Sequence, residues 1–232
     1  MGRVVRESLR PTFTARHVEW SPLTSVVDLT PQPARDLIEI SLAAGSAALD
    51  VDLTSLHDRA GSAEEARFLS IWPGEHYRFL AALVKVLAPE TVVEVGTFRG
   101  MGTIALAHFA PGDVVTYDVI PHSDFGKSCL RPDDLGRGIE QRIGDLSDSS
   151  YFASQLDCLR AAKLIFIDGP KDGSFEFRFI ELLLQHLSGS GTLLVLDDIK
   201  LPRMVAFWRW LPLAKCDVSS LGHYTGTGVA RL

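Results

Sequence analysis

The sequence predicts an α/β protein with a doubly wound, mostly parallel sheet of about seven strands, a helical N-terminal cap and a C-terminal antiparallel hairpin. From residue 91 onward, short runs rich in β-branched residues alternate with longer segments of helical periodicity, which is the pattern of βαβ units. Before residue 90, the periodic segments have helical spacing. We therefore expect residues 1–70 to form the cap and residues 71–232 to form the main domain.

The individual elements follow from this alternation. The short apolar runs predict parallel strands at residues 91–95, 114–117, 139–143, 164–167 and 192–196. The longer segments predict helices at 33–49, 62–70, 75–88, 100–110, 148–160, 174–187 and 202–211. The stretch after Tyr117 is broken by proline and glycine and is expected to be partly loop. Segments 213–219 and 226–232 flank a glycine-rich turn, which predicts the antiparallel hairpin at the sheet edge.

Composition and charge narrow the classes of function. The chain has 232 residues, of which 46% are hydrophobic, and its 23 Lys and Arg against 29 Asp and Glu give a net charge of −6. This acidic balance argues against a protein that binds nucleic acid or anionic membranes by neutralising phosphates. The three widely spaced cysteines favour a reducing compartment. The sequence has no apolar run of the length that a membrane span needs. We expect a cytoplasmic protein.

Acidic residues follow the end of every expected parallel strand. In an open parallel α/β sheet, ligands bind outside the carboxyl ends of the strands, so these side chains lie where a ligand would bind. A single aspartate in such a place is often only a helix cap, but acids at all five ends indicate a binding function. The six acids are Glu94, Asp118, Asp145, Asp168, Asp197 and Asp198.

The first of these turns, EVGTFRGMG, indicates which kind of cofactor would bind. Its glycines Gly96, Gly100 and Gly102 have the spacing GxxxGxG. Phe98 stands where a dinucleotide site has its second glycine, and Glu94 would repel phosphates at short range. S-adenosylmethionine carries a sulfonium and an ammonium but no phosphate, so an acid beside the glycine turn favours its binding.

The other cofactor contacts follow from the positions of the next acids. Asp118 is expected to accept hydrogen bonds from both ribose hydroxyls, and Asp145 is available for the adenine end. Gly96 would let the backbone lie close to the cofactor. The predicted cofactor-binding residues are Glu94, Gly96, Thr97, Gly100, Asp118 and Asp145.

A second cluster of acids predicts a metal site. Asp168 follows the fourth strand, and Asp197 and Asp198 follow the neighbouring fifth strand, so their three carboxylates can converge. Carboxylates that converge without a cation repel one another, and a set of oxygen ligands favours Mg²⁺ over Zn²⁺. The alternative is that Asp198 only caps the following helix and a single aspartate faces the site.

Lys171 is the predicted proton acceptor, with Asp172 and His223 as alternatives. A neighbouring metal ion and partial burial are expected to lower the pKa of the lysine amine towards the range of a useful base. The alternative without a catalytic role is a surface lysine paired with Asp172. Of the three histidines considered, which are His122, His186 and His223, only His223 lies in a segment that could line the substrate site.

These motifs resemble those of class I S-adenosylmethionine-dependent methyltransferases. The likeness covers about residues 71–232 and points to the metal-dependent O-methyltransferases, which include catechol and macrocin-type sugar enzymes. VVEVGTFRGMG matches the first motif, TYDV the ribose-binding acid, RIGDL the adenine-side motif, and IDGPKD with VLDDI the metal and base motifs. The resemblance implies a Rossmann-like fold and aligns Lys171 with the catalytic lysine of the catechol enzymes. Asp198 is as in the sugar enzymes, whereas Pro170 stands where those often have an acidic base.

The leading hypothesis is therefore Mg²⁺-dependent methyl transfer from S-adenosylmethionine to a hydroxyl of a small molecule. Asp198 favours a saccharide or glycosylated metabolite over a catechol or phenol. A nicotinamide-dependent oxidoreductase and a catalytically silent binding module are the alternatives from other classes. The cap is expected to close over the substrate and to contribute to a homodimer interface. Five aromatic residues could stack on a substrate ring, although packing is the commoner role: Trp72, Tyr77, Trp208, Trp210 and Tyr224.

Overall fold

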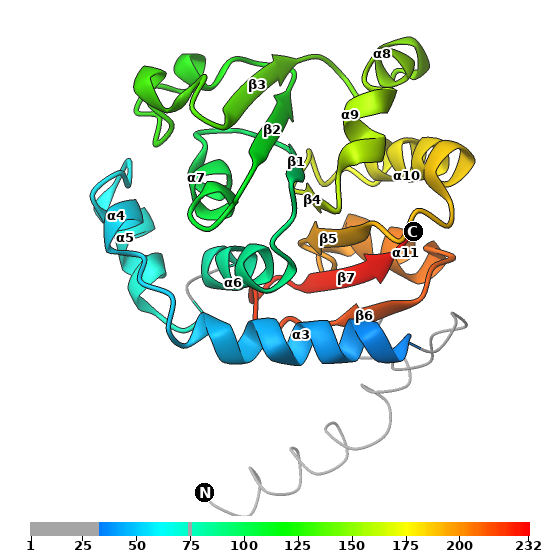
Figure 1. The fold of residues 1–232 in the computed structure, drawn as a ribbon, viewed down its shortest axis with the longest axis horizontal. Coiled ribbons are helices and arrows are strands. Elements are labelled where there is room, and N and C mark those ends of the chain that lie inside the picture. Colours follow the sequence, from blue (N-terminus) through cyan, green and yellow to red (C-terminus); the bar gives the residue numbers. More distant parts are fainter. Residues whose placement is uncertain (1–32, 74–75) are drawn as a thin grey trace, which may run out of the picture.

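The computed structural model describes residues 33–73 and 76–232 and has a seven-stranded sheet at its centre (Figure 1). The strands are β1 Thr91–Val95, β2 Asp113–Asp118, β3 Ile139–Ile143, β4 Leu164–Ile167, β5 Leu193–Asp197, β6 Lys215–Asp217 and β7 Thr227–Arg231. Their order across the sheet is β3-β2-β1-β4-β5-β7-β6. The first five strands are parallel, and β7 is antiparallel to both β5 and β6. The predicted fold class is confirmed.

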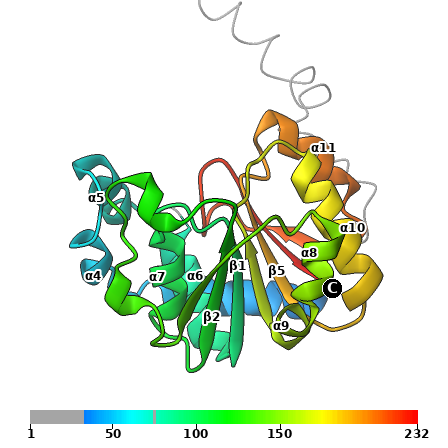
Figure 2. The same cartoon turned by 90° about the horizontal axis from the view of Figure 1, so that it is seen from above.

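Helices cover both faces of the sheet (Figure 2). One face packs against the helices α3 Arg35–Ala48, α6 Tyr77–Leu87 and α7 Met101–Ala107, with the shorter α4 Thr54–His57 and α5 Ala63–Ser70 beside them. The other face packs against α8 Ser149–Ser154, α9 Leu156–Ala161, α10 Ser174–Leu187 and α11 Pro202–Trp210. The described part of the predicted cap therefore shares a hydrophobic core with the sheet, whereas its first 32 residues lie outside the described residues.

The described elements differ from the sequence prediction at a few places. The helix expected at 148–160 is two helices, α8 and α9, which meet at Gln155. The short helix α4 was not expected. The stretch after β2 is mostly loop, as predicted, and contains only the short 3₁₀ helices η1 His122–Phe125 and η2 Pro132–Asp134.

The register of the parallel strands brings the predicted acids together. Val95 of β1 pairs with Ile167 of β4, and Ile167 pairs with Leu196 of β5, so these three strands end at the same level. The residues that follow therefore lie side by side at one edge of the sheet. Because side chains alternate between the faces of a strand, Glu94 and Asp197 lie on the α6 side, the side of Val92 and Val195.

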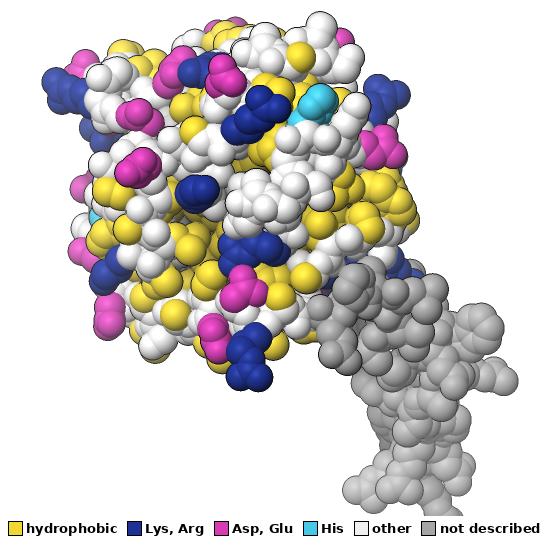
Figure 3. Space-filling view, turned by 45° about the vertical axis from the view of Figure 1, so that its right-hand side comes forward, with side chains coloured by type: hydrophobic (Ala, Val, Ile, Leu, Met, Phe, Trp, Pro, Cys, Tyr) yellow, Lys and Arg dark blue, Asp and Glu magenta, His cyan; other side chains and the backbone are white. Residues whose placement is uncertain are grey.

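On the face of the molecule that Figure 3 shows, charged side chains of both signs are interspersed. On the face in Figure 3, lysines and arginines alternate with acids and apolar side chains and form no continuous basic patch. Among the described residues, no helix has both the length and the apolar character that crossing a bilayer requires.

Gly96 fixes how closely the end of β1 approaches the end of β4. Its backbone has a φ of +104°, and a Cβ atom built there would lie 2.1 Å from the carbonyl oxygen of Asp168. Any other residue would push the two strand ends apart. This glycine therefore sets the distance between the first turn and the predicted metal cluster.

We expect Gly96→Ala to destabilise the protein more than Gly189→Ala. Both replacements place alanine at a positive φ, which costs about 1–2 kcal/mol, but only the first also meets backbone atoms. Gly189 has open space around its Cβ position, so the difference should reflect the close contact alone, about 1–3 kcal/mol. Thermal or urea unfolding of the two variants measures it, and equal stabilities would contradict the proposed contact.

Candidate active site

A cavity of about 540 Å³ lies outside the carboxyl ends of β1, β2 and β4. Gly96, Asp118, Asp145 and Asp168, which the sequence predicts as site residues, line it. Apolar side chains, among them Val119 and Phe175, line other parts of the wall. The cavity thus combines a few carboxylates with apolar surface at the sheet edge where α/β proteins bind ligands.

Asp118 ties the end of β2 to the first turn. Its Oδ2 accepts a hydrogen bond of 2.8 Å from the backbone N–H of Phe98, and its Oδ1 accepts one of 2.7 Å from that of Val119. Each oxygen of an ionised carboxylate can accept a further bond. Asp118 is therefore oriented by the backbone and still offers acceptor capacity to a ligand in the cavity.

The structure places Glu94 beneath the turn rather than among the residues that line this cavity. Its carboxyl group is buried between β1 and α7, where Oε2 accepts hydrogen bonds from the hydroxyls of Thr103 and Thr116. The hydroxyl of Thr97 lies 2.7 Å from that of Thr116 in the same network. Gly102 leaves room for this carboxyl group, since a Cβ atom there would lie 2.3 Å from Oε1.

Gly100 and Phe98 shape the rest of the turn. Gly100 is the N-cap of α7 with a φ of +83°, and a Cβ atom there would lie 2.4 Å from Cβ of Leu130. Gly100 does not line the cavity, whereas Phe98 does, with its ring against that of Phe125. The exposed phenyl ring of Phe98 is thus a lining residue that the glycine spacing alone could not reveal.

The three aspartates of the predicted metal cluster do converge. Asp168, Asp197 and Asp198 each offer a carboxylate oxygen within 4.8 Å of the others. The alternative that Asp198 caps the next helix is wrong, because Leu201 is the N-cap of α11. Asp198 instead adopts a positive φ of 61°, and its side chain faces the cluster.

Lys171 contacts all three carboxylates. Its Nζ lies 2.5 Å from Asp168 Oδ1, 2.8 Å from Asp198 Oδ2 and 3.4 Å from Asp197 Oδ2. Burial acts to lower the pKa of Lys171, but the three negative charges outweigh it and raise the pKa above its usual value. The expected lowering is therefore not found, and in this arrangement Lys171 is an ammonium group that neutralises part of the cluster.

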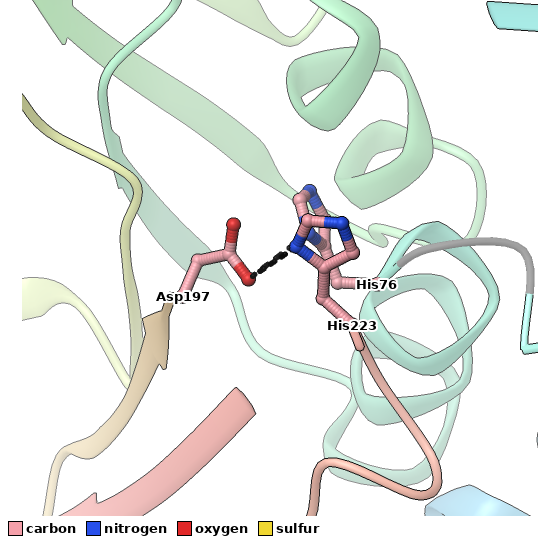
Figure 4. A group of neighbouring side chains, drawn as sticks. All are labelled: His76, Asp197 and His223. Atoms are coloured by element: carbon pink, nitrogen blue, oxygen red, sulfur yellow. Dashed lines mark ion pairs between the residues drawn. The ribbon is translucent and has the colours of Figure 1, made fainter. Parts of the chain in front are cut away.

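Two histidines, His76 and His223, lie beside Asp197 (Figure 4). His76 Nδ1 lies 3.3 Å from Asp197 Oδ1, and His223 Nδ1 lies 3.6 Å from that oxygen. Both the Asp197 carboxyl and the His76 ring are buried. Burial opposes the charge of Asp197, yet His76, His223 and Lys171 hold the pKa of this carboxyl well below its usual value.

His76 was missed by the sequence analysis, and no motif surrounds it. It stands immediately before α6, and the packing of that helix on the sheet brings its ring to the end of β5. Burial acts to lower the pKa of His76, but the Asp197 charge outweighs it and raises the pKa. A buried histidine between carboxylates is a functional-site candidate on physical grounds.

The remaining predicted residues have structural roles. Asp172 accepts hydrogen bonds from the N–H groups of Ser174 and Phe175 at the start of α10, and these bonds lower its pKa. Asp172 lines the cavity, but a helix cap with a lowered pKa is a poor proton acceptor. His122 and His186 lie outside the cluster, the first against Ser128 and the second against Phe152.

The aromatic residues divide into packing and exposed side chains. Trp208 lies against Gly228 of β7, as the packing interpretation expected, and Trp210 packs against Phe177 but is itself 38% exposed. Trp72 and Tyr224 are 46% and 74% exposed. Tyr224 lies beside His223, with ring centroids 4.5 Å apart, so it is the exposed aromatic side chain placed beside the carboxylate cluster.

Comparisons with known proteins agree with this fold. Residues 93–199 match the model of a family described as a methyltransferase domain. Cofactor-bound Rv0187 from MTB is 22% identical, with 85% of this chain and 90% of that chain covered and a TM-score of 0.51. The O-methyltransferase TomG from Streptomyces achromogenes, in complex with SAM, is 18% identical, with 90% and 93% covered and a TM-score of 0.50. Among curated proteins, none matches the sequence closely enough to indicate a relative.

The buried Glu94 predicts a pH-dependent stability. Burial raises the pKa of Glu94 to about 8, against the hydrogen bonds from Thr103 and Thr116, so the folded protein keeps this proton at neutral pH. The unfolded chain loses it near pH 4.5. The stabilisation is therefore complete below that pH and is lost as the pH rises through 8, at about 1.4 kcal/mol per pKa unit of difference.

We expect Glu94→Gln to remove this part of the pH dependence. The melting temperature of the original protein should fall between pH 5 and pH 8.5 more steeply than that of the variant. Glu181→Gln, which alters an exposed side chain of α10, is the matched control and should leave the slope unchanged. Parallel slopes for the original protein and the Glu94 variant would contradict the assignment of a buried neutral carboxyl group.

Proposed function

We propose, from the match of residues 93–199 to the model of a methyltransferase domain, that this protein transfers a methyl group from S-adenosylmethionine to a hydroxyl of a small molecule. The single observation that carries the proposal is the arrangement at the sheet edge. A cavity with cofactor-sized volume adjoins a cluster of three carboxylates, and Asp168 belongs to both. One group of residues would thus hold the cofactor while the adjoining group holds the acceptor.

The cofactor would bind in the cavity with its ribose towards Asp118. The carboxylate there is held by two backbone N–H groups and has acceptor capacity left for the two ribose hydroxyls. Asp145 lines the far part of the cavity, and the exposed Phe98 offers a ring for apolar contact with the adenine. The turn itself contains Gly96 and Thr97, and the buried Glu94 packs behind it.

The carboxylate cluster would hold a divalent cation. The donor set fits one, because Asp197 Oδ1 is buried and makes no hydrogen bond, and because Lys171 balances only one of three negative charges. Mg²⁺ is the cation that Asp168, Asp197 and Asp198 favour as a set of oxygen donors alone. When bound, such a cation supplies Lewis acidity that lowers the pKa of an acceptor hydroxyl.

Lys171 and His223 are the two groups placed to take the proton of that hydroxyl. They reach the carboxylates from opposite sides, with Nζ of Lys171 on one oxygen of each aspartate and Nδ1 of His223 near Asp197 and Asp198. Lys171 accepts a proton only when its carboxylate partners are shared with a cation, because their charges otherwise keep it an ammonium.

For the acceptor we propose a saccharide or glycosylated metabolite, with a catechol or other phenol as the alternative. Asp198 in place of asparagine supports the first, and the exposed ring of Tyr224 beside His223 could stack on either kind of ring. The protein would work in the cytoplasm on small molecules, and a homodimer is part of this proposal.

Asp118→Asn should weaken S-adenosylmethionine binding. Asparagine keeps one oxygen acceptor and loses the other, and a hydrogen bond to a charged group contributes about 1.5–3 kcal/mol, so we expect about 10- to 100-fold weaker binding. Isothermal titration measures it, with NAD as the competing cofactor that should not bind. Asp148→Asn, which alters only the cap of α8, should bind as the original protein does. Equal affinity for the Asp118 variant would exclude this ribose contact.

Turnover should require both an acceptor hydroxyl and the carboxylate cluster. The test is a mass-spectrometric screen of saccharides and phenols with labelled S-adenosylmethionine and a divalent cation. Once an acceptor is known, a chelator and Asp197→Asn should each lower turnover by at least about 100-fold. A residue that binds the metal directly should matter more than the residues behind it, whose loss costs about 10- to 100-fold. The variant should still bind S-adenosylmethionine. Turnover that survives both treatments would refute the metal-dependent mechanism.

A further inference from the structure

The three aspartates present different oxygens to their two sets of neighbours. Lys171 Nζ contacts Asp168 Oδ1, Asp197 Oδ2 and Asp198 Oδ2. The histidines lie at the opposite oxygens, with His76 Nε2 3.9 Å from Asp168 Oδ2 and His223 Nδ1 3.4 Å from Asp198 Oδ1. The carboxylates therefore form a layer with an ammonium on one side and two imidazoles on the other.

The histidine side of this layer contains buried polar atoms without hydrogen bonds. Both ring nitrogens of His76 and Oδ1 of Asp197 are buried and make no hydrogen bond within the described residues. The side chains of His76 and Asp197 are only 4% and 3% exposed. His76 Nδ1 and Asp197 Oδ1 form an ion pair at 3.3 Å, but neither atom makes a hydrogen bond. Buried polar groups that lack hydrogen bonds are costly, so several of them in one site indicate a ligand that satisfies them.

The spacing of these atoms fits a metal ion that accepts nitrogen ligands. Asp197 Oδ1 lies 3.3 Å from His76 Nδ1 and 3.6 Å from His223 Nδ1. Ligand atoms 2.0–2.2 Å from a tetrahedral Zn²⁺ lie about 3.4 Å apart, whereas octahedral Mg²⁺ at 2.0–2.1 Å places neighbouring ligands about 2.9 Å apart. Ligand atoms of His76, Asp197 and His223 all lie within 4.8 Å of one another.

We propose that His76, Asp197 and His223 together bind a divalent transition-metal ion of the Zn²⁺ class, in preference to Mg²⁺. Two imidazoles and one carboxylate form a set of three protein ligands that leaves a position open for a substrate or water, as in catalytic zinc sites. Imidazole ligands favour Zn²⁺, Fe²⁺ and their neighbours over Mg²⁺, which selects oxygen ligands. Asp168 and Asp198 remain the partners of Lys171 on the other side of the layer.

The surroundings supply charge balance and access. Three carboxylates and the Lys171 ammonium leave two negative charges, which one divalent cation neutralises. His223 is 14% exposed and Asp198 16%, so an ion can enter from that side. The hydroxyl of Thr225 lies 2.6 Å from His223 Nδ1 and also donates to Asp198. His223 must therefore release any proton on Nδ1 when it binds the ion, and metal binding should release protons.

This inference rests on the proposed function for an acceptor bound to a metal ion, but it replaces Mg²⁺ on three aspartates by an ion on His76, Asp197 and His223 and leaves Lys171 as the proton acceptor. It is tested by metal binding alone. The full-length protein is titrated with Zn²⁺ and separately with Mg²⁺ in the calorimeter, and with Co²⁺ in the spectrometer. We expect one Zn²⁺ site, with binding at least about 100-fold weaker in His76→Gln and in His223→Gln. Loss of a residue that binds the ion directly should exceed the effect of losing a residue behind it, which is about 10- to 100-fold. We expect Mg²⁺ to bind more weakly than Zn²⁺, and both variants to lose the visible absorption of bound Co²⁺.

Two further variants decide between the candidate ligand sets. Asp168→Asn should bind Zn²⁺ within a few-fold of the original protein, because Asp168 is not one of the three ligands. His186→Gln, which alters an exposed histidine of α10, controls for adventitious binding and should change nothing. Thermal unfolding shows which variants fold. If the buried His76 variant does not fold, His223→Gln, in the loop before β7, tests the inference alone.

Each outcome bears on the inference separately from the proposed function. Zn²⁺ binding that is unchanged in both histidine variants, or that is lost only in Asp168→Asn, would overturn it and leave a carboxylate site for Mg²⁺. Zn²⁺ binding that depends on both histidines supports it, even if no acceptor is ever methylated. Failure to bind S-adenosylmethionine would instead refute the proposed function without affecting the metal site.

Discussion

The repulsion among Asp168, Asp197 and Asp198 is the constraint on which the rest of the site depends. The parallel register of β4 and β5 places these carboxylates side by side, with ligand oxygens within 4.8 Å of one another. Lys171 offsets part of the repulsion through ion pairs with all three carboxylates. Its backbone has a positive φ of 58°, and that of Asp198 has a φ of 61°. Such backbone conformations cost about 1–3 kcal/mol each, and they persist here because each points a charged side chain into the cluster. The strain therefore lies where the chemistry is expected.

The glycines of the first turn connect this cluster to the cofactor cavity. Gly96 allows the turn to touch the carbonyl oxygen of Asp168, Gly100 allows it to pass Leu130, and Gly102 accommodates the carboxyl group of Glu94. Each glycine thus makes room for a neighbouring group of the protein. The motif holds β1, β4 and α7 in fixed relation, and the cavity follows from that relation. A neutral Glu94 beneath the turn also adds no repulsion to the nearby aspartates.

Sequence reasoning reached the sheet and its acidic edge because both depend on local patterns. Alternating short and long apolar segments predicted all five parallel strands, and the order of βαβ units then placed Asp118, Asp168 and Asp197 at one edge. His76 could not be found this way, since only the packing of α6 on the sheet brings it to Asp197. The direction of the Lys171 pKa shift could not be predicted from the sequence either. A lysine near a metal motif suggested a lowered pKa, whereas three carboxylates around Nζ raise it.

Asp168 links the two halves of the site. It lines the cofactor cavity, bonds to Lys171 and lies within reach of the cation cluster. In the proposed reaction, a methyl donor in the cavity and an acceptor on the cluster can meet only beside this residue, at a near-attack distance of about 3–3.5 Å. The contact between Gly96 and the Asp168 carbonyl then has a mechanistic consequence. Because it fixes how far the turn stands from the end of β4, it would also set the distance between a donor held by the turn and an acceptor held by the cluster.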